Sequence, residues 1–191
     1  FFSFSNQIKQ LILDNCQGQK IAGLTEEFKN LEVLSMINAS LSSLKGFPAL
    51  PKLRRLELSD NRFTNGLEYL EGCENLNHLT LCGNRFKDFE SIEPLKKLKN
   101  LENLDLFNCG ITEVQNYRDK VFEMLPSLKY LDGYDRANKE SEDADEDDEE
   151  DEDLDEEDFD DEEEDEDAGH GGNLKSLLGD IDVSLFVFVL F

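Results

Sequence analysis

Histidine and cysteine are the residue types that most readily support catalysis or metal binding, and this chain has few of either. Its 191 residues include only His78 and His170, far apart in sequence, and four Cys without a CxxC pair. A zinc site or a disulfide framework needs several such residues at short spacing. No Ser or Cys nucleophile is paired with His78 in a recognisable motif, so we expect neither a catalytic centre nor a cofactor.

Carboxylates are the abundant reactive groups, and most of them lie in one segment. Residues 140–167 hold 24 Asp and Glu in 28 positions, without a single Lys or Arg. The segment lacks the Gly and the oxygen-ligand spacing of a calcium loop, so we expect diffuse cation binding and no specific metal site. Because such a run cannot bury apolar area and repels itself, it predicts a disordered acidic tail.

The rest of the chain is nearly neutral. The net charge is −26 overall, yet residues 1–139 carry 19 Asp and Glu against 18 Lys and Arg. This balance argues against direct nucleic-acid binding and against docking on an anionic membrane, since both need a basic surface. A basic protein is the expected partner.

Targeting signals and membrane spans are not evident. The longest apolar run, Leu185–Phe191, is far shorter than the roughly 18 residues of a membrane span. The start lacks a secretory-type signal, and with no disulfide pattern this favours a reducing intracellular compartment. Because the chain starts with Phe1 rather than Met, we expect either a fragment or an imperfect gene model. Residues 168–191 have no assigned role, and we expect them to be disordered.

A repeated pattern of leucines organises the near-neutral part. The pattern L-x-x-L-x-L-x-x-N/C occurs five times, with starts 22 to 25 residues apart, which is the period of leucine-rich repeats. The five copies run from Ile8 to Cys16, Leu31 to Ala39, Leu53 to Asn61, Leu76 to Asn84 and Leu101 to Cys109.

Each repeat predicts one short strand with its leucines facing inward. Stacked strands form a parallel sheet over one continuous core, so the fold class is α/β, a right-handed leucine-rich-repeat solenoid of five repeats plus a C-terminal cap. The Asn position supplies side-chain bonds to the turn. Ala39 cannot make them, so we expect a looser turn in the second repeat.

The segments between and after the repeats predict helices and a cap. Apolar residues from Phe86 to Leu98 recur at helical steps, and Tyr117, Val121, Met124 and Leu125 line one face of a helix that Pro126 ends. Leu128 and Leu131 then start a last strand. The N-terminal "FFSFSNQ" is too short for a good helical cap. Residues 1–139 thus form the repeat domain.

The residues between the inward leucines should face outward on the concave side, where solenoids bind partners. The alternative is that the concave side contacts only solvent and binds no partner. Phe107 is the most suggestive member, because an exposed aromatic beside acidic residues is a plausible hot spot. The predicted partner-binding residues are His78, Thr80, Cys82, Glu102, Asp105, Phe107, Lys129, Tyr130 and Asp132.

Two apolar residues and one serine interrupt the acidic tail. Leu154 and Phe159 are either sequence drift or anchors that bind an apolar pocket on a basic partner. Ser141, in "KESEDADED", resembles an acidophilic kinase site, although Ala144 stands at the +3 position. The tail as a whole either keeps the chain soluble or competes with DNA for basic proteins.

Several strings that include solvent-facing residues resemble one family. "LELSDN" (56–61), "SIEPLKKLKNL" (91–101), "LDLFNC" (104–109) and "YLDGYD" (130–135), followed by the acidic tail, are similar to the acidic leucine-rich nuclear phosphoprotein 32 family. The resemblance implies a nuclear protein that can shuttle to the cytoplasm. It also implies a non-enzymatic chaperone that shields core histones and inhibits their acetylation.

Two other functions stay open. The same resemblance implies an inhibitor of protein phosphatase 2A that acts through the repeat domain. An acidic calcium buffer of a secretory lumen is a weaker alternative, because the chain shows neither a signal peptide nor a retention motif.

Overall fold

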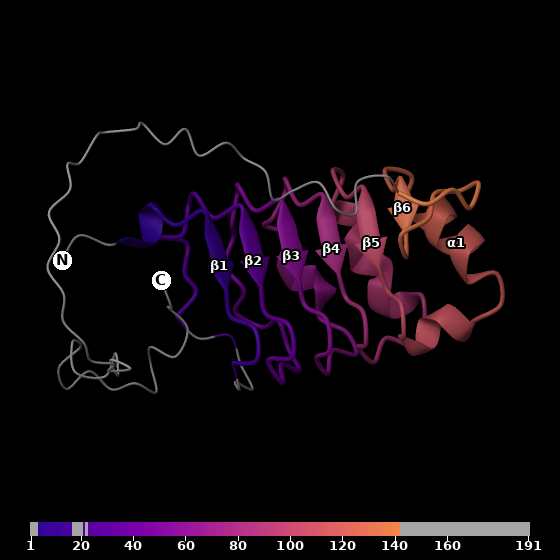
Figure 1. Cartoon of the computed structure of the whole chain (residues 1–191), viewed down its shortest axis with the longest axis horizontal. Helices are drawn as coiled ribbons and strands as arrows, with labels where there is room; N and C mark the ends of the chain where they lie inside the picture. The colour runs from indigo at the N-terminus through magenta and orange to yellow at the C-terminus, as the bar shows by residue number, and fades with distance from the viewer. Residues whose placement is uncertain (1–3, 17–20, 22, 142–191) are drawn as a thin grey trace, which may run out of the picture.

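A single parallel sheet runs along the molecule. The computed structural model describes residues 4–16, 21 and 23–141. Six short strands lie side by side in chain order within this part (Figure 1). They are β1 (Gln10–Ile12), β2 (Val33–Ser35), β3 (Arg55–Glu57), β4 (His78–Thr80), β5 (Asn103–Asp105) and β6 (Tyr130–Leu131).

The repeat leucines set the register of this sheet. The central residue of each strand is a leucine, and Leu56 pairs with Leu79, which in turn pairs with Leu104. These leucines are almost fully buried and belong to one continuous core, because each repeat covers the apolar side of the next. The predicted α/β leucine-rich-repeat solenoid, with five repeats and a cap strand, is confirmed.

Buried amides hold the turns that follow the strands. The Asn84 Nδ2 group donates to the carbonyl oxygens of Leu81, in its own repeat, and Leu58, in the preceding one, both at 2.9 Å. The Cys109 thiol donates to the Leu81 carbonyl at 3.3 Å, which is a weaker bond of the same kind. The Asn position therefore joins neighbouring repeats as well as closing its own turn.

The turn at Ala39 keeps backbone bonds like those of its neighbours, but Ser40 directly after it adds a second left-handed residue, with a φ of 57°. Asn61 reaches back and donates to the carbonyl oxygen of Met36 at 2.8 Å. The backbone N–H of Asn38 also donates to Ser59, as the N–H of Asp60 does to Cys82 one repeat later. Asn84 makes the same kind of bond to the Leu58 carbonyl, so the bond from Asn61 is common to the repeats, and a looser turn at Ala39 stays a prediction.

The side opposite the exposed face of the sheet is built from short helical turns. Three of them are 3₁₀ helices: η2 (Leu67–Leu70), η3 (Glu90–Lys97) and η4 (Gly110–Glu113). The apolar residues around η3 recur at every third position, which is the period of a 3₁₀ helix. Ile92 and Leu95 bury this face, and Pro94 lies inside the element.

The C-terminal cap contains the single α-helix of the described residues, α1 (Tyr117–Met124), which lies at the end of the sheet (Figure 1). Tyr117, Val121 and Phe122 are buried, and the chain then leads into β6. The Arg118 guanidinium donates to the Leu131 carbonyl at 2.9 Å and so joins helix to strand.

A short 3₁₀ turn, η1 (Phe4–Asn6), precedes the first strand. The Asn30 amide donates to the backbone carbonyl of Asn6 at 2.7 Å. The predicted tail beyond Ser141 and the segment 168–191 lie outside the described residues, and so do Leu154 and Phe159.

Candidate interaction surface

The strands carry an exposed face on which alternate residues point away from the core. His78 and Thr80 of β4, Asp105 of β5 and Tyr130 of β6 flank the buried leucines and are half-exposed. Cys82 and Phe107 lie in the turns after β4 and β5, and Asp132 directly follows β6. Glu102 and Lys129 stand one residue before their strands, in a separate row at the amino edge of the sheet.

Asn103 also belongs to this face, although we did not predict it. It pairs in register with His78, and its Nδ2 group lies 2.6 Å from His78 Nε2. His78 Nδ1 lies 3.0 Å from Asn77 Oδ1. A neutral imidazole that carries its proton on Nδ1 satisfies both contacts, so the two amides hold His78 as a structural link between repeats.

Side chains from three repeats and the C-terminal cap lie close to the backbone around Phe107. We name Asp60, Cys82, Asp105, Phe107 and Asp132 the Phe107 patch. The Phe107 N–H donates to Asp105 Oδ1 at 2.8 Å, and its carbonyl accepts from Gly83 N–H at 2.9 Å. The Phe107 side chain is 66% exposed, the largest fraction among the exposed large apolar residues of the described chain.

The carboxyl group of Asp132 joins the cap to the fifth repeat. Its Oδ1 accepts from the Leu106 N–H at 2.8 Å and from the Tyr117 hydroxyl at 3.4 Å. Burial raises the pKa of the Asp132 carboxyl, and the nearby charge of Asp105 adds to this, although the bond from Leu106 acts in the opposite direction. Burial, followed by the charge of Asp132, also raises the pKa of Tyr117.

The cysteines of this region are held as thiols. Burial raises the pKa of Cys82, and the carboxylates of Asp105, Asp60 and Asp132 raise it further. Burial likewise raises the pKa of Cys109 to about 11. Because the thiolate is the reactive form, these shifts make both groups poor nucleophiles at neutral pH.

A column of left-handed residues shapes the turns at the carboxyl edge. In all five repeats the residue directly before the Asn position has a positive φ: 60° at Asn15, 52° at Asn38, 56° at Asp60, 67° at Gly83 and 57° at Asn108. Asn, Asp and Gly tolerate this conformation best. At Gly83 an added Cβ would lie only 2.3 Å from Asp60 Oδ1, so the carboxylate of Asp60 lies directly over the next turn.

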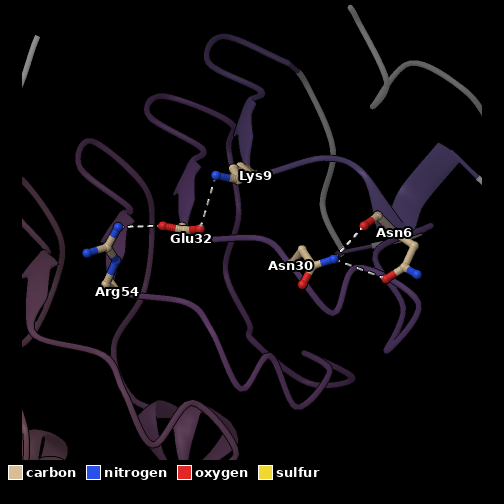
Figure 2. A network of polar contacts seen from close by, with 5 residues as sticks. All are labelled: Asn6, Lys9, Asn30, Glu32 and Arg54. Atoms are coloured by element: carbon tan, nitrogen blue, oxygen red, sulfur yellow. Dashed lines mark hydrogen bonds and ion pairs between the residues drawn. The ribbon is translucent and has the colours of Figure 1, made fainter. Parts of the chain in front are cut away.

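The amino edge of the sheet carries a row of alternating charges. Glu32 lies between two cations, with an ion pair of 4.0 Å to Lys9 Nζ and a second ion pair to Arg54 (Figure 2). Lys129 Nζ and Glu102 Oε2 form the same kind of pair at 2.8 Å. The two residues predicted as partner contacts are therefore engaged with each other across neighbouring repeats.

An open cleft of about 500 Å³ lies over this row. Its lining is polar and carries both signs of charge, so it favours neither an anion nor a cation. The residues around it are Glu32, Lys52, Arg54, Asn75, Asn77, Asn100 and Glu102.

The described part of the chain holds neither a cluster of metal ligands nor a membrane-spanning helix. Within residues 4–16, 21 and 23–141, no three His, Cys, Asp or Glu side chains are placed to share a metal ion. None of the helices in that part of the chain has the length and apolar character needed to cross a bilayer.

The sheet and its repeats define a class of protein. A family model described as "Leucine-rich repeat" matches residues 2–154, so the chain belongs to the leucine-rich repeat family. A chain of the crystal structure of the Drosophila melanogaster SNF/U2A′ complex has a similar fold, with a TM-score of 0.57 and 26% identity. The match covers 64% of this chain and 72% of that one.

Curated relatives narrow the class further. The chain is 49% identical over 138 residues to acidic leucine-rich nuclear phosphoprotein 32 family member A of Drosophila pseudoobscura pseudoobscura. It is 50% identical over 135 residues to the protein of the same name from Drosophila melanogaster. These matches cover 72% and 71% of this chain, and they confirm the resemblance found in the sequence. In both cases the chain spans 52% of the relative, or about half its length.

Proposed function

We propose that this protein is a non-enzymatic chaperone that binds core histones and shields their basic surfaces from DNA and from acetylation. The observation that carries the proposal is the density of charge in residues 140–167, where 24 of 28 residues are acidic. Histones contact DNA through Arg and Lys side chains. A dense polyanion joined to a folded domain competes for the same groups.

The repeat domain supports this function by holding the polyanion on a stable scaffold. The cap is hydrogen-bonded up to the start of the acidic segment, because the Ser141 N–H donates to the Gly133 carbonyl at 2.9 Å. The acidic run therefore begins at a fixed point beside β6. Relatives named as nuclear phosphoproteins support action in the nucleus, and we extend this to shuttling through the cytoplasm.

The experiment compares core-histone binding by the full chain and by a chain that ends at Ser141. We expect the full chain to bind more tightly, and its affinity to fall steeply between low and physiological salt, because exposed charges are screened over about 8 Å at physiological ionic strength. Equal affinities of the two chains would overturn the tail as the main contact.

Inhibition of protein phosphatase 2A is the second candidate, and the exposed Phe107 favours it because the repeat domain offers a partner surface of its own. If the repeat domain inhibits the phosphatase, the chain that ends at Ser141 should keep this inhibition. Loss of both histone binding and phosphatase inhibition on truncation would instead assign both activities to the tail.

A further inference from the structure

Basic side chains follow one another along the turns at the carboxyl edge of the sheet. In repeats two to five the second residue after the Asn position is buried, as Phe63 and Phe86 are, so the first and third residues face solvent. The flank that these outward residues form holds three cations and no Asp or Glu. We name the outward residues of repeats three to five the basic flank: Arg62, Thr64, Arg85, Lys87, Gly110 and Thr112.

Contacts between repeats bring the cations of the basic flank together. The Arg85 N–H donates at 2.8 Å to the carbonyl of Phe63, the residue directly after Arg62. Lys87 Cγ lies 3.4 Å from the place that a Cβ of Gly110 would take, so the Lys87 stem covers the point at which the fifth repeat lacks a side chain. The three cations therefore form one row that crosses three repeats.

The folded domain leaves this row without counterions. In the part of the chain that the structure describes, Arg62, Arg85 and Lys87 form neither an ion pair nor a side-chain hydrogen bond. Asp88, next to Lys87, is already engaged, because its Oδ1 accepts from the Ser91 N–H at 2.9 Å. The row can therefore bind carboxylates from outside the folded domain.

The acidic segment starts at the same edge of the sheet. The Ser141 N–H donates to the carbonyl of Gly133, which lies in the turn after β6. The repeat of Arg62 contains β3, the third strand from β6, which is about 15 Å away at the usual spacing of strands. A flexible chain as long as residues 140–167 spans roughly 30 Å, which is enough to reach the whole row.

We propose that the basic flank binds the chain's own acidic segment, residues 142–167, within the same molecule. Each exposed ion pair contributes little, but the covalent link gives the segment a local concentration on the order of millimolar at the row. The adjoining sheet face carries Asp60, Asp105 and Asp132, whose charge keeps the segment off that face. This contact goes beyond the proposed function, because a basic partner must first displace the flank from the carboxylates that it binds.

The first test follows the side-chain Nε–Hε resonances of Arg62 and Arg85 by NMR, in the full chain and in the chain that ends at Ser141. At low salt we expect both resonances to differ between the two chains, because carboxylates of the segment bind the guanidinium groups, and we expect the difference to shrink as salt rises. Arg54, paired with Glu32 at the opposite edge, is the internal reference and should not move. Equal resonances of Arg62 and Arg85 in the two chains, or an equal displacement of Arg54, would overturn the proposal.

Dilution separates binding within one molecule from binding between molecules. We expect the displacement of the Arg62 and Arg85 resonances to stay constant over about a hundredfold range of protein concentration. A displacement that fades on dilution would assign the contact to the acidic segment of a second copy and would also overturn the proposal.

The second test measures the affinity of two full-chain variants for polylysine at low salt. One variant replaces the three cations of the basic flank: Arg62→Gln, Arg85→Gln and Lys87→Gln. The matched control removes the same charge at η3 and just after it: Lys96→Gln, Lys97→Gln and Lys99→Gln. Two of these control lysines are already paired with carboxylates of the domain.

We expect the flank variant to bind polylysine about twofold more tightly than the control, because a segment that is bound to the flank half of the time is available only half of the time. Equal affinities of the two variants would refute the contact. Neither test contains histone, so a failure of the proposed function and a failure of this proposal are distinguishable.

Discussion

The Nδ2 group of Asn61 donates a hydrogen bond of 2.8 Å to the carbonyl oxygen of Met36, which belongs to the preceding repeat. The Asn61 side chain also accepts from the Leu41 N–H at 2.9 Å. Its Nδ2 group also donates to the Leu58 carbonyl of its own repeat at 3.0 Å, so one buried amide satisfies backbone groups of two repeats. Stability in this solenoid depends on such bonds between neighbours as well as on shared leucines.

Replacing Asn61 by Ala should lower the free energy of unfolding by about 1–3 kcal/mol, because buried backbone groups lose their partners. Chemical denaturation measures the loss. Asn75→Ala is the matched control, since Asn75 is exposed and donates one bond of 2.7 Å to the Pro51 carbonyl. Equal losses in the two variants would contradict the role given to the buried amide.

Replacing Leu79 or Leu104 by Ala should cost about 2–5 kcal/mol, because each is a nearly fully buried leucine at the centre of a strand. Thr80→Ala changes the neighbouring, outward-facing residue of the same strand and should cost far less. Denaturant melts of the three variants check this. A loss below about 1 kcal/mol for both leucines would refute their inward placement.

Asp132 should give stability a measurable pH dependence. Because its pKa is raised in the folded state, the folded protein binds more protons than the unfolded one between the ordinary carboxyl pKa and the raised value. Stability from this group is therefore present at low pH and falls as pH rises through that window. Asp132→Asn keeps an acceptor for the Leu106 N–H and does not titrate.

The measurement is the difference in unfolding free energy between Asp132→Asn and the parent, followed against pH. The difference should shift in favour of the variant as pH rises through the window and become constant above it. A difference that stays flat, or shifts in favour of the parent, would show that the bond from Leu106 outweighs burial.

The spacing of the leucines predicted the sheet, because leucines that recur about every 23 residues are buried together when the repeats stack as parallel strands. Leu56, Leu79 and Leu104 were thus placed correctly in the core. The contact between His78 and Asn103 could not be foreseen, because it joins two repeats and depends on which outward residues share a register. Glu102 and Lys129 were predicted as partner contacts because they lie beside the inward leucines, and their ion pair with each other also depends on the register of two repeats.

One missed feature did have a signal in the sequence. Every repeat carries Asn, Asp or Gly directly before its Asn position, and those residues tolerate positive φ best. The nature of the helical turns was readable too, because the spacing of three around η3 is that of a 3₁₀ helix. The proximity of Asp60, Asp105 and Asp132 to Cys82 could not be read from the sequence, since the three carboxylates come from two repeats and the cap.

Phe159 should contribute an apolar term to histone binding, and Leu154 a smaller one. Phe159→Ser keeps every charge of the acidic run, so any loss of affinity reports burial of the ring. We expect a loss of about 1.5–3 kcal/mol that changes little with salt. Binding measured at low and at physiological salt tests this, and unchanged affinity at both would reduce the tail to a polyelectrolyte.

The central claim is that the acidic tail competes with DNA for core histones. The most direct measurement titrates preformed histone–DNA complexes with the full chain, and in parallel with the chain that ends at Ser141, at physiological salt, and follows the release of free DNA. We predict that the full chain releases DNA and that the truncated chain does so only at far higher concentration. Equal release by both chains, or none by either, would contradict the claim.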